Sequence, residues 1–335
     1  MRRLPTVVVA TCTVLTLSAC DATVGEGEGE GEGEGEGEGE GEGEGEGEGE
    51  GEPVSPRFVA VGYGGRRLTS ADGASWSNDV AVVDNGGDDD NLLRGACAHG
   101  GVVLAVGGSG HGVVRRSIDG GASWTTAVDD ERGWIGACAF NDDGIVVFVG
   151  SARSARSLDG GVTTVDLDNH FYDGGNWEMR DVMVVDGVFV AVGDLGVSTS
   201  RDGVAWTEPA GPRDLFRIAH GSGHSVAVGA RGHAHSTDLT TWTDTARTGL
   251  GDVVFADGRF LIVGEGFGLT SSDGVVFVEH AQPAISRVAV GSVDGATVYV
   301  GVNYPDVRRT SNDGLTWSEP VRDDSNAIDD VIFMR

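Results

Sequence analysis

The sequence predicts an all-β fold: a seven-bladed β-propeller of four-stranded antiparallel blades that occupies residues 53–335. A Ser-x-Asp box recurs seven times at intervals of 35 to 47 residues, and an apolar run ending on glycine precedes every box. In addition, the first repeat lacks a strand that the C-terminus supplies. A repeat of about 40 residues is typical of propeller blades.

Each box is predicted to form the turn of a hairpin. In the first copy, Ser70 is followed by Asp72, Gly73 and Trp76. Asp-Gly suits a tight turn, because glycine accepts positive φ and aspartate bonds to nearby backbone amides. The third box has Thr164 in place of tryptophan, the fifth lacks the glycine, and the sixth ends on Phe277. The aspartates to which we assign this structural role are Asp72, Asp119, Asp159, Asp202, Asp238, Asp273 and Asp313.

The boxes resemble the Asp-box, or BNR, repeat of sialidases and of many non-enzymatic propellers. The combination of a Val-Gly strand end, a short hairpin and an Asp-Gly-x-x-Trp box is also similar to the photosystem II assembly-factor family and its relatives in non-photosynthetic bacteria. The second resemblance implies a protein that assists other proteins at a membrane surface.

Two further series of apolar runs fill the repeat. In one series, each run ends on a glycine: Gly62, Gly107, Gly150, Gly193, Gly229, Gly264 and Gly301. The other series is expected to form the inner strands; its runs precede those of the first series, and its seventh copy lies at 328–333. The expected order is strand A, strand B, strand C, box and strand D. The C-terminal strand would pair with Phe58–Gly62 and remove the open sheet edge. An open solenoid is the alternative, although solenoids need capping repeats.

One column of the inner strands is expected to face the propeller axis: Gly95, Gly136, Asp181, Arg217, Asp252, Arg287 and Asp330. Its charges alternate in sign over the last five members. One interpretation is a ring of ion pairs between blades that fills the channel. The other is an anion site at the channel mouth that uses Arg217 and Arg287.

Loops that join D to A and B to C share one face, which is the expected ligand face. Its longest loop, 165–178, carries His170, Tyr172 and Trp177, which suit a protein or glycan ligand. Packing of these aromatic residues onto their own blade is the alternative. Further candidates on this face are Tyr63, His111, Arg153, Arg231, Glu265, Phe267 and Tyr304.

Cysteine and metal signals are less specific. Cys97 and Cys138 occupy matching places in neighbouring inner strands. Export favours a disulfide, whereas equivalent side chains should point in the same rotational sense and miss each other. His233 and His235 lack a third ligand at a defined spacing, and the acidic loops lack the spacing of a calcium loop, so we expect no metal and no cofactor.

The N-terminal segment predicts export. Residues 1–19 combine Arg2 and Arg3, an apolar stretch and small residues, as in a signal peptide. Leu17-Ser-Ala-Cys20 resembles the lipobox of bacterial lipoproteins, which implies lipidation of Cys20 and a location in the bacterial cell envelope, anchored to its membrane. Ordinary secretion is the alternative. Residues 20–52 then form a spacer of Gly-Glu pairs, expected to be a disordered tether.

Charge and motifs narrow the function. The chain has a formal charge of −30, of which −17 belongs to residues 53–335, so no nucleic-acid partner is expected. We expect a non-catalytic, monomeric binding or assembly module. The alternative is a sialidase-like glycoside hydrolase. Phe216-Arg217-Ile218 resembles a sialidase motif, but it lies in the middle of the chain, and none of the four tyrosines has an evident glutamate partner.

Overall fold

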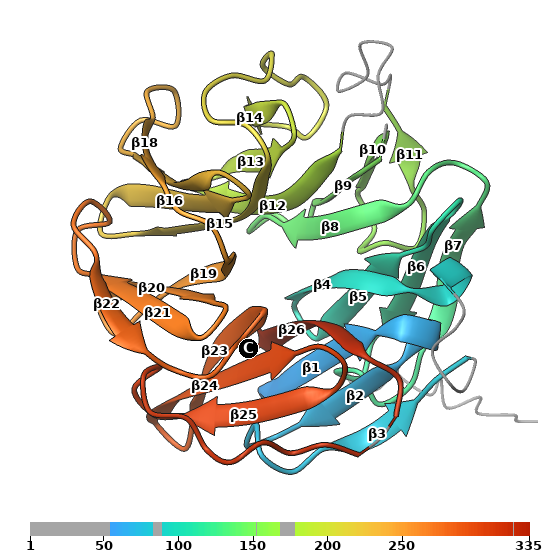
Figure 1. Ribbon diagram of the computed structural model, residues 1–335. Helices are drawn as coiled ribbons and strands as arrows, with labels where there is room; N and C mark the ends of the chain where they lie inside the picture. Colours follow the sequence, from blue (N-terminus) through green and yellow to red (C-terminus); the bar gives the residue numbers. More distant parts are fainter. Residues whose placement is uncertain (1–53, 83–88, 152, 168–177, 324) are drawn as a thin grey trace, which may run out of the picture. The chain divides into compact units, whose positions relative to one another are not determined.

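The computed structural model describes residues 54–82, 89–151, 153–167, 178–323 and 325–335. Residues 52–335 form one compact unit. Seven antiparallel sheets surround a central axis, and Figure 1 looks along that axis, with the innermost strand of every blade facing the middle. The predicted seven-bladed propeller is confirmed.

The blades follow the chain in order. Blade 1 contains β26 (Ile328–Met334), β1 (Arg57–Gly62), β2 (Arg67–Ser70) and β3 (Ser77–Val80). Blade 2 contains β4 (Leu93–His99), β5 (Val102–Gly107), β6 (Gly112–Ser117) and β7 (Thr125–Asp130). Blade 3 contains β8 (Ile135–Phe140), β9 (Val146–Gly150), β10 (Arg153–Ser157) and β11 (Val165–Asp166). Blade 4 contains β12 (Met179–Val185), β13 (Val188–Gly193) and β14 (Gly196–Ser200).

The remaining blades continue this pattern. Blade 5 contains β15 (Leu215–Gly221), β16 (His224–Gly229), β17 (Gly232–Ser236) and β18 (Thr243–Ala246). Blade 6 contains β19 (Leu250–Ala256), β20 (Arg259–Gly264), β21 (Phe267–Ser271) and β22 (Val278–Ala281). Blade 7 contains β23 (Arg287–Val293), β24 (Ala296–Asn303) and β25 (Val307–Ser311). In blades 4 and 7 the outer strand is reduced to single bridges, Val197↔Ala210 and Arg308↔Val321. Two short 3-10 turns, Tyr63–Gly65 and Asp89–Asn91, are the only helical segments in the described part of the chain.

The two ends of the propeller meet in blade 1. Strand β26 pairs with β1 in antiparallel register, with Phe58 opposite Phe333 and their ring centroids 4.9 Å apart. Figure 1 shows dark-red β26 alongside blue β1. The fully buried Arg66 reinforces the junction, because it binds Asp79 of blade 1 and Asp323 from the chain after blade 7, at 2.6 and 2.7 Å. The C-terminal strand thereby closes the ring, as the sequence predicted.

The cores lie between adjacent blades. The second strand of each blade is almost fully buried, and in β1 four consecutive residues from Phe58 to Val61 have no exposed surface. Six of these strands end on glycine because the connecting chain passes directly over that position. A Cβ at Gly107 would lie 1.9 Å from the carbonyl oxygen of Leu92, and one at Gly193 would lie 2.1 Å from that of Glu178.

Blade 7 departs from the predicted alignment. Its second strand is longer, and Tyr299 pairs with the box residue Ser311, as Phe58 pairs with Ser70 in blade 1. Asn303, four residues after Tyr299, therefore takes the place that Gly62 has in blade 1. The sequence had assigned that place to Gly301, so the predicted register was wrong by two residues.

Blade 3 is also shifted, and the shift explains a disulfide. Cys97 pairs with Leu104, three residues before Gly107, whereas Cys138 pairs with Phe148, two residues before Gly150. A change of one residue reverses the face on which a strand side chain lies. Cys97 therefore points toward blade 3 and Cys138 toward blade 2. The two are joined in a disulfide with a Cα–Cα distance of 5.7 Å.

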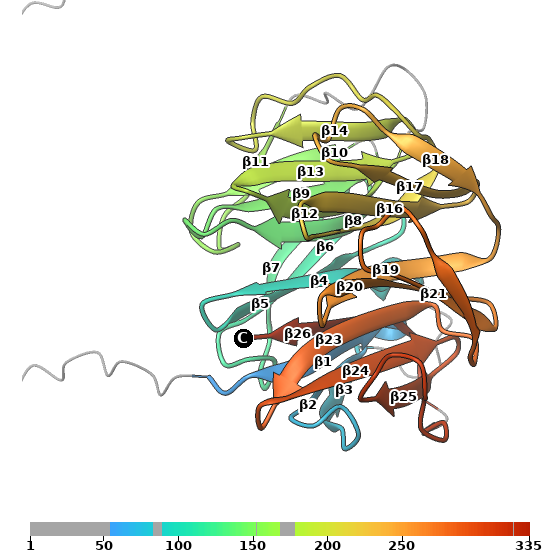
Figure 2. The same ribbon diagram turned by 90° about the vertical axis from the view of Figure 1, so that its left-hand side faces the viewer.

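The described chain enters the propeller on the face of the A–B turns and boxes. A Cβ at Gly101, in the A–B turn of blade 2, would be 3.4 Å from Val54, and a Cβ at Gly120, in the box of blade 2, would be 2.4 Å from it. The inner strands begin at the opposite face, which carries the D–A and B–C connections. Figure 2 shows the ring from the side. Among the described residues, no helix has the length and apolar character to cross a membrane.

Candidate binding site at the axial mouth

Two tiers of side chains surround the axis, because most inner strands contain a bulge near their start. A β-bulge adds an unpaired residue and redirects the side chains beside it. The deeper tier contains Gly95, Ala137, Asp181, Arg217, Asp252, Arg287 and Asp330. The residue before each of these forms the upper tier: Arg94, Gly136, Arg180, Phe216, Gly251, Ser286 and Asp329. The sequence had placed Gly136 in the deeper column, but the register shift of blade 3 puts Ala137 there.

The deep carboxylates bind the backbone of the next blade. Oδ2 of Asp181 accepts the N–H of Ile218 at 3.0 Å, and Oδ2 of Asp252 accepts the N–H of Val288 at 2.9 Å. Across the closure, Oδ2 of Asp330 accepts the N–H of Ala96 at 3.1 Å. An innermost strand has no further strand to pair with, so these aspartates satisfy amides that would otherwise lack partners.

The two deep arginines bond mainly to carbonyl groups. Nη1 of Arg217 donates to the carbonyl oxygen of Phe216 at 2.8 Å, and Nη1 of Arg287 donates to that of Ser286 at 2.8 Å. Longer bonds of 3.4 Å reach the preceding blade at Arg180 and Gly251. None of the five charged side chains of the deeper tier makes a direct ion pair with another. The predicted ring of ion pairs is therefore replaced by bonds to backbone.

Burial changes the charge balance at the axis. It raises the pKa of Asp330 to about 7 and that of Asp181 to about 6, although nearby Arg217 opposes both shifts. Burial also raises the pKa of Asp252. The pKa of Arg287 is lowered, first by burial and then by the like charge of Arg217, but an arginine starts from a pKa far above neutral. Near neutral pH the arginines are therefore charged, while part of the carboxylate charge is neutralised by protons.

The upper tier opens into a cavity of about 100 Å³ on the face of the D–A and B–C connections. Its lining includes four arginines, Arg94, Arg180, Arg217 and Arg287, together with Trp134, Phe216 and Asp329. A cavity of about 390 Å³ adjoins it between blades 6 and 7 and shares Arg180, Phe216 and Arg287. The upper-tier residues of these two blades, Gly251 and Ser286, are small, which leaves this space open. We call the two cavities the axial mouth.

Two of the arginines of the axial mouth make cation–π contacts with aromatic rings. The guanidinium of Arg94 lies 4.5 Å from the ring centroid of Trp134, and that of Arg180 lies 5.7 Å from the ring of Phe216. Arg180 also pairs with Glu178 and Asp194, at 2.7 and 3.0 Å. Sequence reasoning missed Arg94 and Arg180, although both directly precede members of the predicted axial column.

The seven Ser-x-Asp boxes share one hydrogen-bond pattern. In the first, Oδ1 of Asp72 accepts the N–H groups of Ala74 and Ser75 at 2.8 and 2.7 Å, and the hydroxyl of Ser70 accepts the N–H of Gly73 at 2.8 Å. Bonds from Thr163 and Ser157 lower the pKa of Asp159 to about 2. All seven box aspartates have lowered pKa values. The boxes are therefore turn-forming elements on the opposite face from the mouth.

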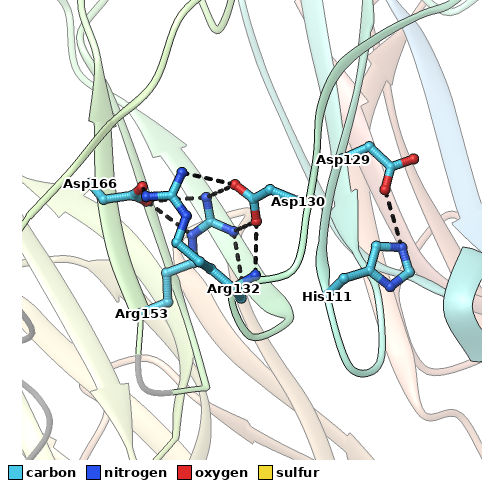
Figure 3. A network of polar contacts seen from close by, with 6 residues as sticks. All are labelled: His111, Asp129, Asp130, Arg132, Arg153 and Asp166. Carbon is cyan, nitrogen blue, oxygen red and sulfur yellow. Dashed lines mark hydrogen bonds and ion pairs between the residues drawn. The ribbon is translucent and has the colours of Figure 1, made fainter.

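A partly buried ion network joins blades 2 and 3 (Figure 3). Arg153, whose side chain is 5% exposed, binds Asp130 at 2.7 Å and Asp166 at 3.1 Å. Arg132 also pairs with both carboxylates. His111 lies beside this network, 3.5 Å from Asp129. Arg153 is thus an interface residue and not an exposed ligand contact.

The other predicted residues are dispersed. His170, Tyr172 and Trp177 lie outside the described residues. Glu265 lines the mouth, Arg231 lines a separate cavity, and Tyr304 is 71% exposed. His233 is buried, with its ring centroid 4.7 Å from that of Phe277. In the described part of the chain, no group of three or more His, Cys, Asp or Glu side chains is arranged to hold a metal ion.

Comparison with known proteins gives structural neighbours. No family model matches the chain, and no curated protein matches it. "YCF48 bound to D1 peptide" is 19% identical, covers 67% of this chain and 77% of its own, and has a TM-score of 0.51. YCF48 from Cyanidioschyzon merolae is 15% identical, with coverage of 70% and 86% and a TM-score of 0.52. The WD40 β-propeller domain of Doa1 is 12% identical, with coverage of 74% and 88% and a TM-score of 0.53. At such low identity these similarities establish the propeller fold alone.

Proposed function

We propose that this protein is an exported, lipid-anchored and non-catalytic module that binds an anionic segment of a protein partner at its axial mouth. The observation that carries the proposal is the gathering of four arginines at one mouth of a chain whose formal charge is −30. Arginine recognises carboxylates through paired hydrogen bonds. A peptide-bound propeller among the structural neighbours supports a peptide or protein ligand over a glycan.

Anchoring rests on the N-terminal sequence, in which Leu-Ser-Ala-Cys20 follows an apolar segment. The described chain begins at Val54, on the face of the A–B turns, and the mouth opens on the other face of the ring. Loss of detergent-phase partitioning in a Cys20→Ala variant is expected, and unchanged partitioning would remove the anchor from the proposal.

The hydrolase alternative has less support. Tyr299 donates its hydroxyl hydrogen to Asp257 at 2.9 Å, at the end of the ring opposite the mouth. Burial and this bond raise its pKa to about 12, which opposes a role as nucleophile. The other described tyrosines, Tyr63 and Tyr304, are not among the residues that line the mouth.

The test measures binding of a labelled acidic peptide by fluorescence anisotropy at low and at physiological salt. Wild-type protein is compared with the Arg94→Gln/Arg287→Gln double variant and with Arg201→Gln, which changes an exposed arginine in a box. We expect the wild type to bind the acidic peptide more tightly than the amidated neutral peptide. The double variant should lose at least about tenfold in affinity, since even one hydrogen bond to a charged group contributes about 1.5–3 kcal/mol. Equal binding by the double variant would refute the mouth as the site.

A further inference from the structure

The cavity between blades 4 and 5 is separate from the axial mouth. It measures about 370 Å³ and is lined by the D–A connection from Gly211 to Arg213 and by strands β17 and β18 of blade 5. Trp242 and Asp244 are its aromatic and acidic members. The repeats themselves indicate what it could hold, because the corresponding place at other blade interfaces is filled.

A guanidinium fills that place at the interface of blades 2 and 3. Asp166 pairs across the sheet with Ala155, two residues before the box serine Ser157, and binds Arg153, four residues before that serine. Figure 3 shows the guanidinium of Arg153 between Asp166 and Asp130. Where blade 1 meets blade 7, Arg66 also lies four residues before its box serine, Ser70, and binds Asp79 of the outer strand at 2.6 Å.

At the interface of blades 5 and 6, a connection supplies the guanidinium. Glu279 pairs with Leu269, two residues before the box serine Ser271. It binds Arg247, which follows the outer strand of blade 5, at 3.1 Å. The guanidinium of Arg247 lies 4.0 Å from the ring centroid of Phe267. Three interfaces thus place an arginine against the same carboxylate position.

Blade 5 keeps the carboxylate and lacks the arginine. Asp244 pairs with Ala234, two residues before the box serine Ser236. Gly232 replaces the arginine, and a Cβ there would lie 2.0 Å from the carbonyl oxygen of Thr245, so no side chain fits. Among the described residues, Asp244 makes no ion pair. The adjacent Arg231 is already paired with Asp214 at 2.5 Å.

In the described chain, the box tryptophan of blade 5, Trp242, also lacks the arginine that contacts the ring in two other blades. Box tryptophans Trp76 and Trp124 each have an arginine over the ring, Arg308 at 5.8 Å and Arg67 at 5.7 Å. No described arginine has a corresponding contact with Trp242. A carboxylate beside an aromatic ring is a favourable site for a guanidinium, through paired hydrogen bonds and cation–π attraction.

We propose that the cavity at Trp242 and Asp244 binds the side chain of an arginine from a protein partner, in the place that Arg66, Arg153 and Arg247 occupy at other interfaces. The cavity opens on the same face as the axial mouth, since it is lined by a D–A connection and by the B–C turn at Arg231. One partner could therefore contact both. The inference does not depend on binding at the mouth, because its residues and the charge of its ligand are different.

The test is isothermal titration of full-length protein with N-acetyl-L-arginine amide and with the neutral isostere N-acetyl-L-citrulline amide. Wild-type protein is expected to bind the arginine compound and not the citrulline compound. Asp244→Asn should weaken binding about fivefold to tenfold. This is the expected effect of losing one charge-assisted hydrogen bond whose strength is reduced by partial exposure to solvent. Asp186→Asn, on an A–B turn of the opposite face, is the matched control and should bind like the wild type.

Arg213 is the internal competitor, because it lies on the connection that lines the cavity. We expect Arg213→Ala to change binding by less than about twofold, because Arg213 is exposed and exposed charges contribute little. Much tighter binding in this variant would show that Arg213 fills the cavity, and would overturn the proposal. Equal binding of citrulline, or unchanged binding by folded Asp244→Asn, would also overturn it. Circular dichroism establishes that each variant is folded.

Discussion

The carboxylate of Asp330 should make the propeller more stable at mildly acidic pH than at alkaline pH. Asp330 belongs to the C-terminal strand and lies deep in the ring, where its pKa is raised from 3.8 to about 7, chiefly by burial. The unfolded chain loses this proton near pH 4, while the folded ring keeps it until about pH 7. The stabilising contribution is therefore complete below pH 4 and is lost as the pH rises through 7.

The magnitude follows from the shift of about three pKa units, each worth about 1.4 kcal/mol, for a total of at most about 4 kcal/mol. Between pH 8 and pH 5 the recovered part is about 3 kcal/mol. For a domain of this size, that corresponds to an increase in Tm on the order of 5 °C. Asp181, with its pKa raised to about 6, contributes in the same direction.

The assay is thermal unfolding from pH 5 to pH 8, followed by circular dichroism, for wild type and Asp330→Asn. Asparagine keeps an oxygen that can accept the N–H of Ala96 but does not ionise. The variant should be more stable than the wild type at pH 8, and its Tm should depend less on pH. Asp294→Asn, on an exposed turn, removes the same charge outside the ring and serves as control. A variant with the wild-type pH profile, or one less stable than wild type at pH 8, would refute the reasoning.

Three further predictions concern two contacts between blades and one box turn. Cys97→Ala should lower the free energy of unfolding by about 3–4 kcal/mol, because the disulfide closes a loop of 41 residues, and a reducing agent should have the same effect on the wild type but none on the variant. Arg66→Ala should cost about 3–5 kcal/mol, because Asp79 loses its buried partner and Asp323 keeps only Arg308. Hydrogen exchange should quicken first in β1 and β26, whereas Arg201→Ala should change neither the stability nor the exchange. Asp313→Ala should cost about 1 kcal/mol in chemical denaturation through loss of the turn bonds to Leu315 and Thr316, and equal stability of this variant and the wild type would contradict the role of the box.

Repetition made the fold predictable from sequence. Each box brings its own turn, as in the bonds of Asp72 to Ala74 and Ser75, which join neighbours in the chain and need no other blade. The glycine that ends the second strand in six of the seven blades was visible as a pattern, although its cause, the carbonyl of the overlying connection, lies in the tertiary structure. Placing the last inner strand at the C-terminus was enough to predict closure.

The candidate site was only partly predictable. Asp181, Arg217, Asp252, Arg287 and Asp330 were recognised as axial because they align in sequence. Arg94 and Arg180 were missed, since a bulge turns the preceding residue toward the same axis and no simple alternation of side chains predicts that. The predicted ion pairs among these charged residues were also wrong. The backbone amides at the unpaired edges of the inner strands bind the aspartates instead.

The sequence by itself determined the repeat, the number of blades and the closing strand, because each depends on local patterns that recur along the chain. Only the tertiary structure decided register and side-chain direction. A shift of one residue in blade 3 turned Cys138 toward Cys97, and the loss of one arginine at Gly232 left a cavity beside Trp242 and Asp244. Such outcomes depend on contacts between neighbouring blades, whose residues are tens of positions apart in the chain, and a displacement of a single residue reverses the face on which a side chain lies.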